Sequence, residues 1–330
     1  MPLVQHNDLP SIERMRSEGI EVCSPKQAND SSLPSIKIGF LNMMPDAALA
    51  ATERQFLRLL AANPAVNCYF YPFSVAGVGR SEQAKLHTNK YYSDFETLKL
   101  INIDALVVTG ANVSQPFLQD ELFWPGLVEV LNWARTKVRS TICSCLATHA
   151  AAKVFYDVKR KHLGEKCWGV FSHKVQQPEH LLLNKVDHDI KMCHSRFNDI
   201  SKNDFIDQGV DVLIYDEHAG VQLACERDKS VVYFQGHPEY DDISLLKEYK
   251  REIIRYLAGQ RNDYPPVPTN YFNQQALDSI RDYSEFIQSA GLKEELIESF
   301  PEDKLSEALD NPWKKSAHTI FSNWMTFLAS

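Results

Sequence analysis

The sequence lacks several features that would assign a protein to a particular class. None of its 330 residues belongs to an apolar run of about 18 or more, so no segment is expected to span a membrane. The N-terminal stretch MPLVQHNDLPSIERMRSEG carries early charges and no apolar core, so we expect no secretory signal. The chain has fewer basic than acidic residues. The net charge of −8 gives no reason to expect nucleic acid or an anionic membrane as a partner.

A disulfide framework is also not expected. The chain has seven cysteines, an odd number scattered over a long sequence, whereas disulfide scaffolds are short and dense in cysteine. We therefore expect a reducing, cytoplasmic setting with mostly free thiols. Five of these residues are predicted to be buried as small hydrophobic side chains, namely Cys23, Cys68, Cys167, Cys193 and Cys225.

Short apolar segments alternate with helical patterns along the chain. Strands are predicted at 36–41, 66–71, 105–109, 140–144, 210–215, 221–226 and 231–235, and helices at 52–62, 124–136, 146–155, 243–258 and 321–328. Near-continuous apolar strands between helices indicate a sheet covered on both faces. The sequence predicts an α/β fold, a three-layer, doubly wound and mostly parallel sheet. Residues 1–35 are predicted to be an irregular arm that packs on a single domain, 36–330, with a C-terminal helical extension.

The stretch RSTICSCLATHAAA places Cys145 between a strand and a helix. A residue at such a boundary occupies a sharp turn with its side chain exposed, and the helix N-terminus favours a thiolate there. The N–H of Leu146 lies in the first helical turn, where it is free to face an oxyanion. Cys143, inside the strand, is expected in the core. A buried structural thiol at position 145 is the alternative, and a metal site is not expected because Cys-x-Cys and His149 lack a second ligand pair.

A second polar motif, FQGHPEY, follows the last predicted strand. A thiol nucleophile needs a base, and that base needs a group that fixes its tautomer. His237 and Glu239 can supply both, with Gly236 and Pro238 holding the turn. Alone, the motif is typical of a surface loop. Together with Cys145 in the same α/β chain, it favours a Cys-His-Glu triad beyond the carboxyl ends of the strands.

Eight motifs in succession resemble one known family. LNMMP, ERQFLRLL, VVTGANV, STICSCLA, GVFSHKV, CHSRF, GHPEYD and IFSNWM follow one another as in the homoserine O-acyltransferases. These are the homoserine O-succinyltransferases and their acetyl-using relatives, which have the class I glutamine amidotransferase-like (flavodoxin-like) fold. The resemblance covers nearly the whole chain, although HPE alone is shared with the glutamine amidotransferases.

The resemblance implies a role for individual residues. Cys145 matches the acyl-accepting nucleophile, His237 the general base and Glu239 its partner. Arg251 matches the arginine that binds the amino acid carboxylate, and Ser195 matches a substrate-contacting serine. Without the resemblance, Arg251 would be read as a solvated helix charge and Ser195 as a turn residue.

The turn after the strand at 105–109 is expected to complete the site. An N–H from the Gly110–Asn112 turn, at Ala111, is predicted to share the oxyanion with Leu146, and Asn112 is predicted to contact substrate. The residue after TGANV is glutamate in acetyl-using members and glycine in succinyl-using members. Here Ser114 is small and can donate a hydrogen bond to a carboxylate, so succinyl is favoured.

A second departure follows the first strand. The family has lysines after Met-Pro, whereas here Pro45 is followed by Asp46 and Ala47, which brings the opposite charge. This departure puts the acyl-donor contacts, and the identity of the amino acid acceptor, in question.

The implied activity is transfer of an acyl group from acyl-coenzyme A to the hydroxyl of L-homoserine through an acyl-cysteine, as in methionine biosynthesis. Acyl-coenzyme A is then a co-substrate, no bound cofactor is expected, and family analogy implies a homodimer. Three alternatives remain. One is acylation of serine or another hydroxyl amino acid, and another is a glutaminase-type hydrolase that uses the same triad. The glutaminase is disfavoured because CLATH lacks the usual glycine after the thiol and no synthetase domain is attached. The third is a non-catalytic binding protein.

Overall fold

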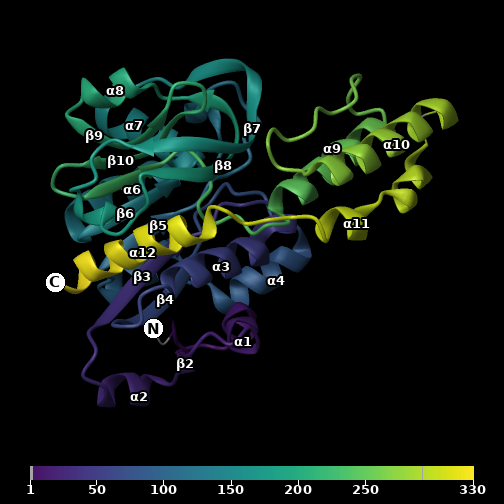
Figure 1. Cartoon of the computed structure of the whole chain (residues 1–330). Helices are drawn as coiled ribbons and strands as arrows, with labels where there is room; N and C mark the ends of the chain where they lie inside the picture. Colours follow the sequence, from purple (N-terminus) through teal and green to yellow (C-terminus); the bar gives the residue numbers. More distant parts are fainter. Residues whose placement is uncertain (1–2, 292) are drawn as a thin grey trace.

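Eleven strands form one mixed sheet in the computed structural model, which describes residues 3–291 and 293–330. Their order is β2-β1-β4-β3-β5-β6-β11-β10-β9-β7-β8 (Figure 1). The strands are β1 (Leu3–Val4), β2 (Val22–Cys23), β3 (Ser35–Leu41), β4 (Asn67–Phe73), β5 (Ala105–Val108), β6 (Ser140–Ser144), β7 (Lys161–Val175), β8 (Asp189–Asp199), β9 (Val210–Asp216), β10 (Gly220–Glu226) and β11 (Val231–Phe234).

The strands from β2 to β11 in this order pair in parallel, and they include the buried strands that the apolar runs predicted. Residues 140–144 form β6 with the predicted bounds. In the register, Val107 pairs with Ile142 and Cys143 pairs with Tyr233. Since all these strands run the same way, their carboxyl ends meet at one edge of the sheet, where ligands bind in folds of this kind.

The other half of the sheet is antiparallel, from β11 through β10, β9 and β7 to β8. The long hairpin of β7 and β8 was not predicted from the sequence. Both strands carry charged residues at many positions, and only part of each strand is buried. Such strands lack the continuous apolar run by which the parallel strands were recognised.

Helices cover both faces of the sheet. They are α1 (Pro10–Ser17), α2 (Pro25–Asp30), α3 (Asp46–Leu60), α4 (Glu82–Tyr91), α5 (Phe95–Ile101), α6 (Trp124–Lys137), α7 (Leu146–Tyr156), α8 (Lys202–Ile206), α9 (Ser244–Leu257), α10 (Gln274–Ala290), α11 (Glu302–Ser306) and α12 (Lys314–Ala329). Three short 3₁₀ turns lie at Leu118–Asp120, Leu181–Leu183 and Glu294–Ser299.

Two separate apolar clusters show the three-layer arrangement. On one face α1, α3, α9, α10 and α12 pack on the sheet, with Phe40 of β3 against Phe56 of α3. On the opposite face α5, α6, α7 and α8 do so, with Val108 of β5 in one cluster with Leu127 and Ala147. The predicted doubly wound α/β fold is therefore confirmed. Figure 1 shows α12 lying across the parallel strands, with α9, α10 and α11 extending to one side.

The N-terminal segment is more regular than the irregular arm that was predicted. β1 pairs in parallel with β4, Leu3 opposite Cys68, and so extends the sheet. α1 buries Ile12 and Met15 in the same cluster as α3. Two-residue strands carry too little pattern to be recognised from sequence.

All seven cysteines are free thiols. Cys68, Cys193 and Cys225 are buried as predicted, but Cys23 and Cys167 are only partly buried, so that prediction was wrong for these two. Both lie on strands at the outer parts of the sheet, where fewer elements cover them. Within the described ranges, no helix is both long enough and apolar enough to cross a membrane.

Candidate active site

Cys145 occupies a strained turn between β6 and α7. Its backbone has φ 51° and ψ −108°, an uncommon conformation for a residue with a side chain. The chain reverses there because β6 ends at Ser144 and α7 begins at Leu146. Cys145 remains partly exposed, whereas Cys143 is fully buried in the core. The predicted elbow is confirmed, and so is the separation of the two thiols.

Neighbouring groups hold this turn in place. The N–H of Cys145 donates to the carbonyl of Phe234 at 2.7 Å, and the hydroxyl of Thr148 lies within hydrogen-bond distance of the carbonyls of Cys143 (2.8 Å) and Phe234 (2.9 Å). A β-carbon built on Gly110 would lie 3.7 Å from the β-carbon of Cys145. The turn after β5 is therefore beside the thiol, as the sequence predicted.

His237 and Glu239 follow β11 at the same edge of the sheet. Nδ1 of His237 lies 2.8 Å from Oε1 of Glu239, and both side chains are buried. The N–H of His237 donates to the carbonyl of Cys193 at 2.8 Å. Gly236 is required on steric grounds, because a β-carbon there would lie 2.1 Å from Oε1 of Gln222 and 2.5 Å from the carbonyl oxygen of Cys193. The turn therefore fixes where the imidazole lies.

The imidazole of His237 interacts with both Cys145 and Glu239. Burial alone would lower the pKa of His237, but the charges of Cys145 and of Glu239, whose Oε1 lies 2.8 Å from the ring, raise it well above its ordinary value. Since Nδ1 faces Glu239, Nε2 is the nitrogen available to Cys145. The ring of Tyr240 stacks on the imidazole with centroids 4.1 Å apart. The arrangement can hold a thiolate–imidazolium pair oriented by a carboxylate.

Glu248 on α9 is the centre of a polar cluster that the sequence did not reveal. It accepts hydrogen bonds from Ser195 (2.6 Å), Trp168 (2.8 Å) and Tyr240 (2.6 Å), and it pairs with Lys166 at 3.1 Å. Burial would raise the pKa of Glu248, but Lys166 and these hydrogen bonds hold it below its usual value. Because Tyr240 also stacks on the imidazole of His237, this cluster packs directly against the candidate site.

Ser195 and Arg251 occupy different positions relative to this cluster. Ser195 is part of it through its bond to Glu248. Arg251 lies on α9 three residues after Glu248, with its side chain 58% exposed and a 3.6 Å ion pair to Glu252. Its charge helps to lower the pKa of Lys166, after burial, which is the main cause. The structure thus places Arg251 at the rim of the cluster. The sequence contains one indication of this position. Arg251 comes three residues after Glu248, and residues three apart on a helix share a face.

The turn carrying Ala111, Asn112 and Ser114 is anchored by a buried carboxylate. Glu121 accepts hydrogen bonds from the N–H groups of Ser114 (2.5 Å) and Gln115 (2.7 Å), and from the hydroxyl of Ser114 at 3.2 Å. Asn112 and Ser114 are exposed, while Ala111 is partly covered. The hydroxyl of Ser114 is therefore held by Glu121 in this structure.

Arg160 is a second feature that the sequence did not reveal. It lies between α7 and β7, half-buried, and burial lowers its pKa while Glu121 and Cys145 act in the opposite direction. The charge of Arg160 also helps to lower the pKa of His149, which lies one turn after Cys145. Burial is the main cause of that shift. The charge of Arg160 is therefore coupled both to Cys145 and to Glu121, the carboxylate that holds Ser114.

Asp46 does not face the thiol as an isolated negative charge. It accepts a hydrogen bond from the N–H of Ser81 at 2.7 Å and pairs with Arg80 at 3.3 Å. The same arginine donates to the carbonyls of Asn42 and Met44, in the loop that precedes α3. The charge reversal after Pro45 is thus compensated locally. In the described part of the chain, no group of three or more His, Cys, Asp or Glu is arranged to hold a metal ion.

The doubly wound sheet, with this thiol at a strand–helix elbow and a buried His-Glu pair at the same edge, has the class I glutamine amidotransferase-like fold. Two solved structures share the fold. A glutamine amidotransferase from Thermotoga maritima has a TM-score of 0.50 and 9% identity, covering 89% of this chain and 99% of that one. One from Methylobacillus flagellatus has a TM-score of 0.50 and 16% identity, with 89% and 95% covered.

Within that class the chain belongs to the homoserine O-succinyltransferase family, whose model matches residues 2–330. It is 47% identical to the homoserine O-succinyltransferase of Methylococcus capsulatus, over 98% of this chain and 92% of that protein. The enzyme of the same name from Cardiobacterium hominis is 39% identical over 98% and 91%. The predicted family resemblance is confirmed, and membership supports an acyltransferase role.

Proposed function

We propose that this protein transfers a succinyl group from succinyl-coenzyme A to the hydroxyl of L-homoserine, a step of methionine biosynthesis. The main support is the thiol of Cys145 at its elbow, together with a buried His237 whose pKa Cys145 helps to raise and whose Nδ1 lies 2.8 Å from Glu239. The relatives named above carry the same activity in their names.

In the first step the Cys145 thiolate attacks the thioester carbon, and the carbonyl oxygen becomes an oxyanion. The N–H groups of Leu146 and Ala111 are proposed to hold that oxygen. One such donor is typically worth roughly 3–4 kcal/mol in the transition state. The tetrahedral intermediate then collapses, its carbon–sulfur bond to coenzyme A breaks, and His237 gives its proton to the departing thiolate. An acyl-cysteine remains.

In the second step homoserine enters. His237, now neutral, removes the proton of the hydroxyl as its oxygen attacks the acyl carbon. The ester forms, the bond to sulfur breaks and the thiolate is restored. Glu239 stabilises the imidazolium at both stages. Arg251 is proposed to bind the amino acid carboxylate, with Ser195 and Asn112 contacting the rest of the substrate.

The proposed preference for succinyl rests on two side chains, Ser114 and Arg160. Ser114 is small enough to leave room for a four-carbon acyl group. Arg160 places a cation in the field of Cys145, and a carboxylate at the far end of the acyl chain is the group it would pair with. An acetyl group has no such carboxylate.

The test is release of coenzyme A thiol from succinyl- and acetyl-coenzyme A, each with homoserine and with serine. We expect turnover with succinyl-coenzyme A and homoserine, and a succinyl adduct on Cys145 by intact-protein mass spectrometry when the acceptor is withheld. Cys145→Ala should give neither. Near-normal rates in that variant would exclude the scheme, and ammonia release from glutamine would favour a glutaminase instead.

The homodimer implied by family analogy stays a prediction, to be checked by light scattering.

A further inference from the structure

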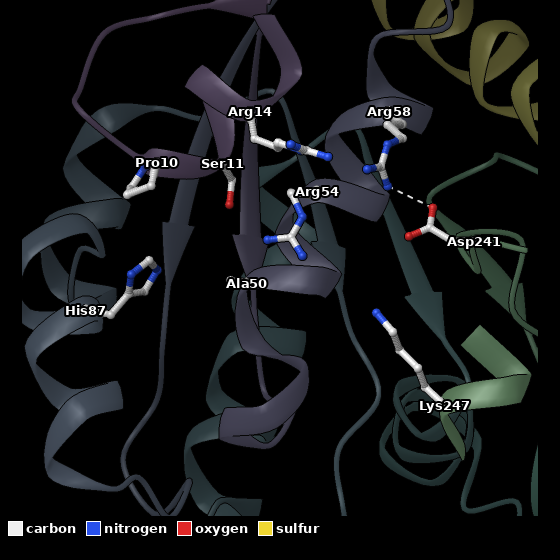
Figure 2. A pocket seen from close by; sticks show the side chains of 9 residues that line it. All are labelled: Pro10, Ser11, Arg14, Ala50, Arg54, Arg58, His87, Asp241 and Lys247. Carbon is white, nitrogen blue, oxygen red and sulfur yellow. Dashed lines mark hydrogen bonds and ion pairs between the residues drawn. The ribbon is translucent and has the colours of Figure 1, made fainter. Parts of the chain in front are cut away.

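A cavity of about 590 Å³ lies on the α3 side of the sheet, between α1, α3, α4 and α9. Nine residues line it: Pro10, Ser11, Arg14, Ala50, Arg54, Arg58, His87, Asp241 and Lys247. Figure 2 shows Arg14, Arg54 and Lys247 around this cavity, on three different helices. None of the assigned site residues is among them.

The lining has a large excess of positive charge. Four of its residues are arginine or lysine and one is a carboxylate, on a chain whose net charge is −8. Arg58 is neutralised by Glu18 (2.8 Å) and Asp241 (2.8 Å). In contrast, the side chains of Arg54 and Lys247 make no ion pair or hydrogen bond with any residue in the described ranges. The cavity therefore offers two unpaired cations to a ligand with more than one negative charge.

The floor of the cavity is fixed rather than pliable. Behind it lies Glu53, which is fully buried and accepts hydrogen bonds from Ser11, from His87 (2.7 Å) and from Tyr92 (2.7 Å). Because both Ser11 and His87 are held from behind, the wall keeps its shape. The buried carboxylate is committed to these partners and does not neutralise Arg54.

Two segments of the chain lead from this cavity toward the proposed active site. The sulfur of Met44 would lie 3.7 Å from a β-carbon on Gly110, which itself would lie 3.7 Å from the β-carbon of Cys145. α3 begins two residues after Met44, and its residues 47, 50 and 54 share one face. From Asp46 to Arg54 the helix rises about 12 Å. On the opposite wall, Asp241 comes two residues after Glu239.

These distances match one component of the proposed reaction. The pantetheine arm of coenzyme A is comparable in length with about five extended residues, or roughly 17 Å. With its thioester at Cys145, the arm would pass over the alanines at the start of α3 and bring its phosphates to Arg54. Ala47 and Ala50 leave this path free of long side chains.

We propose that this cavity binds the phosphates of the acyl-coenzyme A donor, with Arg54 and Lys247 as the main contacts. This inference rests on the proposed function, since it presumes a coenzyme A thioester as donor. The contacts that give affinity for coenzyme A would then lie on a surface separate from the reacting groups.

The test compares two donors that differ only in the phosphate-bearing end: succinyl-coenzyme A and succinyl-pantetheine. In the Arg54→Gln/Lys247→Gln double variant, we expect the KM for succinyl-coenzyme A to rise about tenfold, because two charge-assisted contacts are lost. Its kcat, and all constants for succinyl-pantetheine, should not change. Arg281→Gln removes an exposed charge on α10, away from the cavity, and should leave both donors unaffected. Thermal unfolding checks that each variant is folded.

Each outcome distinguishes this inference from the proposed function. An unchanged KM for succinyl-coenzyme A, or an equal loss with both donors, would overturn the cavity assignment while the acyl transfer stands. If the unmodified protein turns over neither thioester, the proposed function fails first. Adenosine 3′,5′-bisphosphate should compete with succinyl-coenzyme A. Its binding to the cavity without competition would indicate a separate phosphorylated effector and would also overturn the proposal.

Discussion

Replacing Glu239 by glutamine tests the central pair of the site with almost no change in shape. Oε1 of Glu239 lies 2.8 Å from Nδ1 of His237, and the carboxylate is only 7% exposed. Its other oxygen is buried without a hydrogen-bond partner in the described residues. Glutamine fills the same space and keeps one hydrogen bond, but it removes the negative charge that stabilises the imidazolium.

The size of the effect follows from the geometry. Two unit charges with centres about 4 Å apart interact by about 4 kcal/mol at an effective dielectric constant of about 20. A neutral hydrogen bond retains part of this, so we expect a loss of about 3–4 kcal/mol in the transition state. That corresponds to a fall in kcat of about 10²–10³-fold. Because Glu239 helps to raise the pKa of His237, the imidazole of the variant should lose its proton at a lower pH than in the unmodified protein.

Two measurements check this prediction. The rate of thiol release from succinyl-coenzyme A gives kcat, and NMR titration of the ring of His237 gives the change in its protonation. Glu226→Gln is a matched control. Glu226 lies on β10, outside the candidate site, where it is also buried and accepts hydrogen bonds from Tyr156 and Tyr233. It should lower stability and leave kcat unchanged. A kcat for Glu239→Gln within a few-fold of normal, or an unmoved titration of His237, would refute the assigned role.

Three further predictions concern other charged groups. Arg251→Gln should raise the KM for homoserine about tenfold with little change in the KM for the acyl donor, and a change confined to the donor would contradict its role. Arg160→Gln should lower kcat/KM for succinyl-coenzyme A about tenfold but leave acetyl-coenzyme A unaffected, so an equal loss would remove it from acyl selection. Burial lowers the pKa of His149 to about 3 and that of His173 to about 4. Below pH 6.5 the unfolded chain therefore binds more protons than the folded one, and the free energy of unfolding should fall by about 2 kcal/mol for each histidine between pH 7 and pH 5. Urea titrations at the two pH values measure this, with His149→Gln and His173→Gln expected to weaken the dependence; a flat profile would contradict it.

The parallel half of the fold was predictable because its sequence signals are local. β6 and α7 could be read from an apolar run that meets an alanine-rich helix, and both have the predicted bounds to within one residue. The hairpin of β7 and β8 was missed because its strands pair with each other and with β9, leaving charged positions exposed along both. α4 and α10 were missed as well, and α4 buries only two of its residues.

The residues of the candidate site also differ in whether local sequence signals pointed to them. Cys145, His237 and Glu239 could be proposed as site residues from the sequence, because each follows a buried strand and the chemistry requires those residue types. Glu248 was not recognisable, since an acidic residue on a helix surface is common and its partners come from β7, β8 and the turn after β11. Arg160 was missed for a related reason. Its relation to Cys145 depends on how the chain returns after α7, which no local pattern records.

Under the two proposals, the departures from the family pattern at Ser114 and after Pro45 have a common physical meaning. The first turns of α3 carry Asp46, committed to Arg80 and Ser81, and then mostly alanines, so these turns themselves present no long cation. The next cation on that face is Arg54, two turns further along. Positive charge would then act at two separated points, at Arg160 for the acyl carboxylate and at the cavity for the phosphates. Exposed charges more than about 10 Å apart interact weakly through solvent, because salt screens most of the interaction. Selection of the acyl group and affinity for coenzyme A can then change independently, which a single lysine beside the thioester would not allow.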